Sequence, residues 1–136
     1  MPQMIFLNLP VKNLETTKGF FGKLGFSFNP QFSDENTACL VISDTIFAML
    51  LTEPRFKEFT KKEIVDASKY TEAMFALSAE SRERVDELVD TALASGGSPA
   101  NETVDQGFMY GRSFQDPDHH IWEVVWMDPA VVQDQG

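Results

Sequence analysis

Apolar residues near the start of the chain alternate as in a β-strand and then recur as in an α-helix. Residues 5–11 place Ile5, Leu7, Leu9 and Val11 on one face, with Phe6 and Asn8 on the other. After Asn13, a preferred N-cap residue, apolar positions return at helical spacing as far as residue 24. Three shorter strand patterns follow, at residues 26–32, 37–42 and 45–52. Residues 1–53 are therefore predicted to form a βαβββ module.

The same order of elements returns after a charged segment. Residues 54–70 are rich in charged side chains and contain few apolar positions, which is typical of a surface connector with short helical turns. A strand pattern at 71–78 precedes a helix from Ser81, in which Leu88, Val89 and Leu93 are expected to pack on a sheet. Three further strands are predicted, and they cover residues 99–104, 108–115 and 120–127. This pattern indicates a second βαβββ module over 71–128, followed by a C-terminal tail at 129–136.

Two modules of the same order indicate a tandem repeat. The predicted fold class is α+β, with two curved sheets around a shared cleft and one helix on the convex side of each sheet. The whole chain is expected to form one structural domain. A small ligand would bind in such a cleft, because concave and largely apolar surfaces are the usual ligand sites of proteins.

Composition narrows the possible partners and the compartment. The 136 residues are 43% hydrophobic and include 11 Lys and Arg against 21 Asp and Glu, for a net charge of −10. Such a chain folds, but it offers no basic surface to nucleic acid or to an anionic membrane. Cys39 is the single cysteine, which excludes an intrachain disulfide and a zinc site made of cysteines. Without an export signal or a long apolar run, the protein is predicted to be cytoplasmic.

Three segments of the chain resemble the vicinal oxygen chelate superfamily. They are Leu9-Pro10-Val11-Lys12-Asn13-Leu14-Glu15, the helix segment 20–26, and the late run Asp116-Pro117-Asp118-His119-His120-Ile121-Trp122-Glu123. This superfamily includes glyoxalase I, extradiol dioxygenases, and the fosfomycin and bleomycin resistance proteins. The chain is most similar to its uncharacterised bacterial glyoxalase-like branch. The resemblance implies the same fold, and it implies a homodimer, because these modules pair within a chain or across two chains.

The resemblance also implies a divalent-metal site with one ligand from the first and last strand of each module. Phe6 stands where the superfamily usually has a histidine, and residues 48–50 are apolar where it has a carboxylate. The same alignment places Glu72 and Glu123 at the two ligand positions of the second module, with His119 in place of a usual glycine. Catalytic metal sites normally use at least three protein ligands, so the metal site is expected to be degenerate.

Two functions remain open at this point. The first is binding of a small organic molecule in an apolar cleft. The residues expected to contact it are Phe6, Asn8, Met49, Met74, Tyr110 and Arg112, with Tyr110 and Arg112 holding an anionic group. The second is a metal-dependent lyase, isomerase or dioxygenase that uses a divalent metal on Glu72 and Glu123, with Glu123 as the catalytic residue. The missing ligands favour binding, the two glutamates favour chemistry, and ordinary glyoxalase I activity is not expected.

Three other residues with reactive side chains are expected to have structural roles. His119 and His120 are adjacent, so they would point to opposite faces of a strand and cannot chelate one ion together. Cys39 lies in an apolar run, where a buried thiol behaves as a small hydrophobic group.

Overall fold

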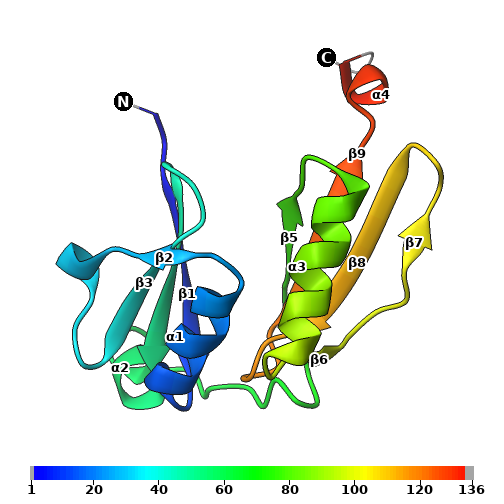
Figure 1. The fold of residues 1–136 in the computed structure, drawn as a ribbon. Helices are drawn as coiled ribbons and strands as arrows, with labels where there is room; N and C mark the ends of the chain where they lie inside the picture. Colours follow the sequence, from blue (N-terminus) through cyan, green and yellow to red (C-terminus); the bar gives the residue numbers. More distant parts are fainter. Residues whose placement is uncertain (1, 134–136) are drawn as a thin grey trace. The chain divides into compact units, whose positions relative to one another are not determined.

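The computed structural model describes residues 2–133 and divides the chain into two compact units, residues 1–66 and 67–136. Part of the expected C-terminal tail, residues 134–136, lies outside the described residues. The order of elements is βαβββ in the first unit and a variant of it in the second (Figure 1). No helix within residues 2–133 has the length and apolar character needed to cross a membrane.

The first unit is a four-stranded sheet with strand order β1-β4-β3-β2. Its elements are β1 (Ile5–Val11), α1 (Leu14–Lys23), β2 (Ser27–Phe28), the 3-10 turn η1 (Pro30–Phe32), β3 (Thr37–Val41), β4 (Ile46–Thr52) and α2 (Glu53–Lys57). β1 runs parallel to β4, and the other neighbouring strands are antiparallel. The predicted strand at 26–32 is shorter than expected because Pro30 starts the 3-10 turn, whose first amide is capped by Asn29.

Helix α1 forms where the pattern predicts it. The side chain of Asn13 accepts a hydrogen bond from the Thr16 amide at 3.1 Å and so caps the helix start. Gly25 follows the helix with a φ of 96°, a left-handed conformation that favours glycine. The buried face of the helix consists of Leu14, Thr17, Phe20 and Phe21. It covers the sheet face formed by Leu9, Leu40 and Leu50, which are at most 7% exposed.

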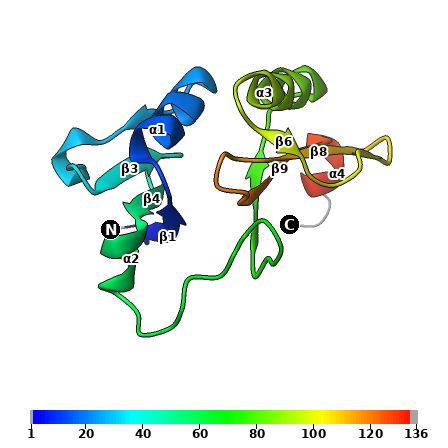
Figure 2. The same ribbon diagram turned by 90° about the horizontal axis from the view of Figure 1, so that it is seen from below.

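The second unit repeats this arrangement with strand order β5-β9-β8-β6, and β7 also pairs with β8. Its elements are β5 (Met74–Ser78), α3 (Arg82–Ala94), β6 (Ser98–Pro99), β7 (Val104–Asp105), β8 (Met109–Gln115), β9 (Ile121–Met127) and α4 (Pro129–Gln133). Helix α3 is capped by the Ser81 hydroxyl, which accepts from the Arg84 amide at 3.0 Å. Leu88 and Val89 are buried and Leu93 is half-buried, with α3 packed on β8 and β9 (Figure 2).

Two predicted strands of the second unit differ from the structure. β5 begins at Met74, so the first three residues of the predicted strand 71–78, Glu72 among them, precede it. The predicted strand 99–104 is interrupted: β6 and β7 both pair with β8, and residues 100–103 between them leave the ladder. In place of strand pairing, the amide of Asn101 donates to the Ser113 hydroxyl at 2.7 Å.

Candidate functional site: the far faces of the two sheets

Each sheet has one face covered by its helix and an opposite face, which we call the far face. In the first sheet, residues that alternate with the helix-covered positions lie on the far face, since neighbouring residues of a strand point to opposite sides. The register of β1 and β4 pairs Phe6 with Phe47 and Asn8 with Met49, and so puts these four side chains on the far face. The structure therefore brings together Phe6, Asn8 and Met49, as the sequence analysis expected.

The far face of the first sheet has an aromatic surface beside an amide. The rings of Phe6 and Phe47 are stacked with centroids 5.0 Å apart, and Phe6 is 45% exposed while Phe47 is buried. The exposed Asn8 amide donates to the carbonyl of Phe6 at 3.3 Å, within the same strand. Met49 is half-buried. A flat apolar group could stack on Phe6 and still reach the polar end of Asn8.

In the second sheet, the register separates the predicted site residues into two groups. Phe114, Trp122 and Val124 are fully buried on the face that α3 covers. The residues that alternate with them, including Glu123 on β9 and Met74 on β5, lie on the far face. Met74 is 52% exposed and Glu123 is half-buried. Met74 and Glu123 are therefore on the same face of one sheet.

Glu72 has a different position from the one that the sequence alignment assumed. Met74 precedes the helix cap Ser81 by the same seven residues that separate Phe6 from the cap Asn13. The counterpart of Phe6 in the second unit is therefore Met74, and Glu72 is an exposed residue ahead of the strand. By the same register, Met49 in the first unit corresponds to Glu123 in the second.

The metal implied by the superfamily has few donors on these faces. In residues 2–133, Glu123 is the one carboxylate that a strand places on a far face, and the described part of the chain contains no group of three His, Cys, Asp or Glu arranged to hold a metal ion. Catalytic metal sites normally use three protein ligands. The donors that each sheet presents by itself do not fit a divalent cation.

Tyr110 and Arg112 lie on the opposite side of the second sheet from Glu123. The Tyr110 hydroxyl donates to Asp86 of α3 at 2.6 Å, and the Arg112 guanidinium contacts Asp86 and Asp90 at 2.9 Å each. The hydrogen bonds from Tyr110 and then from Arg112 hold the pKa of Asp86 below its ordinary value. The structure therefore does not bring Tyr110 and Arg112 together with Glu123.

A buried carboxylate that the sequence analysis did not single out holds the start of β9. Asp116 is 2% exposed, and its oxygens accept hydrogen bonds from the amides of Asp118 and His120 and from the Trp122 indole at 2.9, 3.1 and 3.0 Å. Burial raises the pKa of Asp116, although the charge of His120 and these hydrogen bonds oppose that shift. An aspartate before a proline turn was the signal that could have identified it.

His119 and Cys39 have structural roles in this arrangement. His119 has a φ of 69°, the left-handed conformation that explains why a glycine suits this turn position. Cys39 is fully buried, and burial raises the pKa of its thiol. Cys39 therefore behaves as the hydrophobic core residue that the sequence analysis expected.

Comparisons with known proteins agree with the fold. The family model described as bleomycin resistance protein-like N-terminal matches residues 3–43. A sequence search of curated proteins finds no significant match. Among solved structures, a hypothetical protein from S. aureus is 25% identical with a TM-score of 0.78, covering 93% of this chain and 94% of its own.

Two further solved structures share the fold at lower identity. A glyoxalase-related enzyme from Fulvimarina pelagi has a TM-score of 0.77 at 19% identity, over 93% of this chain and 88% of that one. A genomically encoded fosfomycin resistance protein from Listeria monocytogenes has a TM-score of 0.66 at 20% identity, over 93% and 91%. The family match covers residues 3–43 in the first unit, and the solved structures share the fold, so both findings agree with a similarity to the vicinal oxygen chelate superfamily. The resemblance seen in the sequence and the predicted α+β fold are both confirmed.

Proposed function

We propose that this chain binds a small organic molecule through the far faces of its sheets, and that its metal site is degenerate. The observation that carries the proposal is the exposed aromatic surface of Phe6, stacked on Phe47 and placed beside Asn8 and Met49. Phe6 is apolar where the superfamily resemblance implies a metal ligand, and Met74, its counterpart in the second unit, is apolar as well. These side chains favour contact with an apolar ligand over coordination of a metal.

The exposed part of Phe6 sets the scale of this interaction. A phenylalanine side chain buries about 150–250 Å² when fully covered, and apolar area contributes roughly 25 cal/mol per Å². Since Phe6 is 45% exposed, covering it with a ligand ring would contribute about 2 kcal/mol. That free energy corresponds to more than a tenfold change in affinity.

Charge favours a neutral or cationic ligand over an anionic one. The chain has a net charge of −10, and Glu123 is the carboxylate presented on the far face of the second sheet. An acidic surface attracts cations and repels anions at a distance. Bleomycin and fosfomycin, which occur in the names of the matched family and of a structural neighbour, are suitable probes of opposite charge character.

The test is a titration of the full chain, labelled with ¹³C at its methionine methyl groups, with bleomycin and separately with fosfomycin. Binding at the far face of the first sheet should shift the methyl signal of Met49, and binding at the far face of the second sheet should shift that of Met74. Phe6→Ala should weaken binding of the bound probe by more than tenfold, as expected for the loss of about 2 kcal/mol. Phe32→Ala, which removes a ring that is 56% exposed on the turn η1, is the matched control and should leave binding unchanged. Binding that neither variant alters, or no binding by either probe, would contradict the proposal.

The second candidate is a metal-dependent lyase, isomerase or dioxygenase, and it is favoured by the position of Glu123 on the far face. In that case Glu123 is the catalytic residue and Glu72 is the second ligand. Elemental analysis of the purified chain before and after soaking in Ni²⁺ or Zn²⁺ would distinguish the two candidates. Stoichiometric metal that Glu123→Gln removes, together with isomerisation of the glutathione–methylglyoxal adduct, would support the enzyme and refute simple binding.

We also infer that the protein is a cytoplasmic homodimer. The apolar residues Met4, Ile5 and Ile46 are 37–51% exposed at one end of the paired strands β1 and β4. Exposed apolar side chains that lie close together are typical of contact surfaces between protein chains. Light scattering at micromolar concentration tests this directly, and a mass of 15.3 kDa, that of one chain, would contradict it.

A further inference from the structure

Residues 100–103 form a bulge at the edge of the second sheet. Pro99 pairs with Phe114 and Val104 pairs with Gly111, so the four residues between them stand opposite Arg112 and Ser113 alone. The extra residues must leave the plane of the sheet, as in any bulge. Residues 100–103 therefore do not take part in the strand pairing with β8.

Asn101 is the residue of this bulge that reaches the far face. Its amide donates to the Ser113 hydroxyl at 2.7 Å, and that hydroxyl donates to the Asn101 carbonyl at 3.2 Å. Ser113 is 8% exposed and pairs with Glu123 in the sheet. The Asn101 side-chain amide then lies 3.7 Å from the sulfur of Met74 on β5, with β8 and β9 between the bulge and that strand. Asn101 is therefore held on the face that carries Glu123 and Met74.

The contact between Asn101 and Met74 is easily exchanged for a contact with a ligand. A thioether sulfur is a weak acceptor, whereas a carbonyl or hydroxyl oxygen accepts an amide hydrogen more strongly. The Asn101 side chain is exposed, so a ligand oxygen can approach it. An asparagine amide can also accept a hydrogen bond from the same ligand group.

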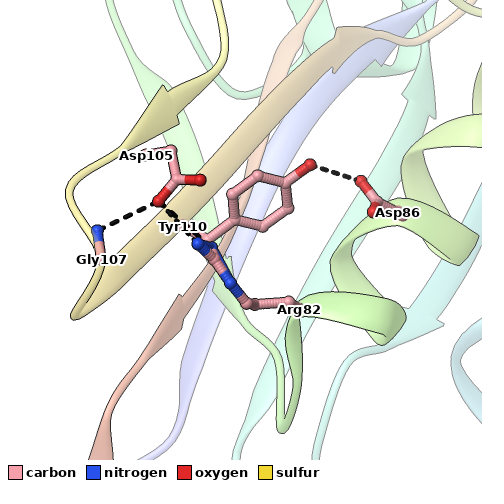
Figure 3. Close-up of polar contacts among 5 residues, drawn as sticks. All are labelled: Arg82, Asp86, Asp105, Gly107 and Tyr110. Atoms are coloured by element: carbon pink, nitrogen blue, oxygen red, sulfur yellow. Dashed lines mark hydrogen bonds and ion pairs between the residues drawn. The ribbon is translucent and has the colours of Figure 1, made fainter.

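The other end of the bulge is tied to α3 on the opposite side of the sheet. The Arg82 guanidinium donates to Asp105 Oδ1 at 2.6 and 3.2 Å, and the Gly107 amide donates to the same oxygen at 3.0 Å (Figure 3). Arg82 also lies over the Tyr110 ring at 4.6 Å and the Trp126 ring at 5.6 Å. Cation–π contacts of this kind hold a guanidinium in one orientation. The ion pair therefore fixes β7, which follows directly after the bulge.

We propose that Asn101 is a ligand-contacting residue of the second far face, and that Arg82 and Asp105 are the pair that positions it. This inference rests on the proposed binding function and names one chemical feature of the ligand. The ligand presents a carbonyl or hydroxyl oxygen to the Asn101 amide, next to an apolar group that contacts Met74.

The first experiment measures binding of bleomycin to the full chain and to two bulge variants. Asn101→Ala should weaken binding about tenfold, which corresponds to about 1.4 kcal/mol, within the range of one lost hydrogen bond. The variant keeps the bulge, because both hydrogen bonds with Ser113 use main-chain atoms of Asn101. Thr103→Ala removes an exposed polar side chain from the same bulge and should bind as the original chain does.

The second experiment measures amide hydrogen exchange without any ligand. Arg82→Gln should increase exchange at the Asn101 amide at least tenfold, because the bulge is released, with no change of that size in the strand β9. Arg84→Gln, which breaks the surface pair between Arg84 and Glu87 on the same helix, is the control. Unchanged exchange at Asn101 in Arg82→Gln would overturn the role of the positioning pair.

The outcomes separate this inference from the proposed function. If bleomycin binds the original chain and Asn101→Ala binds it equally well, the role of Asn101 is refuted and the binding function stands. If bleomycin does not bind the original chain, the proposed ligand role of Asn101 is refuted, and the binding function still stands if fosfomycin binds. Weaker binding in Asn101→Ala together with unchanged binding in Thr103→Ala supports the inference.

Discussion

The buried carboxylate of Asp116 is predicted to be the main support of the turn that leads into β9. Its oxygens accept from two backbone amides and from the Trp122 indole, and the side chain is almost completely shielded from water. Asp116→Asn keeps the size of the side chain but replaces one acceptor oxygen with a donor. The new amino group would face either the indole N–H or the two backbone amides, so at least one buried donor loses its partner.

The expected loss of stability follows from these contacts. A buried donor without a partner destabilises a protein by about 1–3 kcal/mol, and the asparagine can keep the remaining hydrogen bonds. Asp116→Ala removes all three hydrogen bonds and should therefore be the more damaging change, by about 3 kcal/mol or more. For a domain of this size, each kcal/mol corresponds to roughly 2–8 °C in Tm.

The effect of Asp116→Asn should also depend on pH. Burial raises the folded-state pKa of Asp116 above its ordinary value of 3.8. A raised folded-state pKa gives a stability contribution that is full below 3.8 and is lost as the pH rises through the folded value. The asparagine variant has no such contribution, so the stability difference between the two proteins should shrink as the pH rises.

Urea unfolding of both proteins between pH 4 and pH 8, followed by far-ultraviolet circular dichroism, would measure this difference. Asp44→Asn, an exposed turn substitution, is the control and should change the free energy of unfolding by less than about 0.5 kcal/mol. If the stability difference between the original chain and Asp116→Asn grew with pH, the hydrogen-bond donors would favour the ionised carboxylate of Asp116, and the predicted pH dependence would be wrong. A difference below about 0.5 kcal/mol at every pH would refute the supporting role of Asp116.

Three further predictions concern the second unit. Leu88→Ala should lower the free energy of unfolding by about 2–5 kcal/mol, because Leu88 is 6% exposed under α3, and urea unfolding would show a change under 0.5 kcal/mol if that packing were wrong. His119→Val should lower the Tm more than His119→Gly in calorimetry, because a β-branched residue is strained at a φ of 69°, and the reverse order would contradict this. Tyr110→Phe should raise the pKa of Asp86, since the Tyr110 hydrogen bond is the main cause that lowers it. In the original chain, the lowered pKa of Asp86 stabilises the folded state above pH 3.8, and this contribution is lost as the pH falls through the folded-state pKa. A ¹³C carboxyl titration in which the Asp86 pKa of Tyr110→Phe is no higher than that of the original chain would contradict the assignment.

Much of the fold was predictable because its signals are local. The helix caps Asn13 and Ser81 act on amides three residues away, and the apolar spacing that follows each cap marks the face that packs on the sheet. The strands of the pairs β3–β4 and β8–β9 follow one another closely in the sequence, so their antiparallel pairing could also be predicted. The grouping of Phe6, Asn8 and Met49 followed from alternation within strands once β1 and β4 were paired.

Register and face were decided only by tertiary pairing. If the alignment of the second module on the first is shifted by two residues, the predicted counterpart of Phe6 changes from Met74 to Glu72. The sequence alone contained no contact that would choose between these two residues. The side of the sheet that Tyr110 and Arg112 occupy depends on α3, whose Asp86 is 24 and 26 residues away from them. The bulge at 100–103 exists because the Ser113 hydroxyl replaces a strand partner, an interaction across 12 residues.

The sequence by itself determined which segments form helices and strands, and which of their faces are apolar, because those properties depend on neighbouring residues. Only the tertiary structure decided which polar side chains share a face with Glu123, since that depends on pairing between strands distant in the chain. It placed Asn101 and Met74 on that face and Arg112 on the other. Hydrogen bonds and register between distant strands, rather than local preference, are the physical reason.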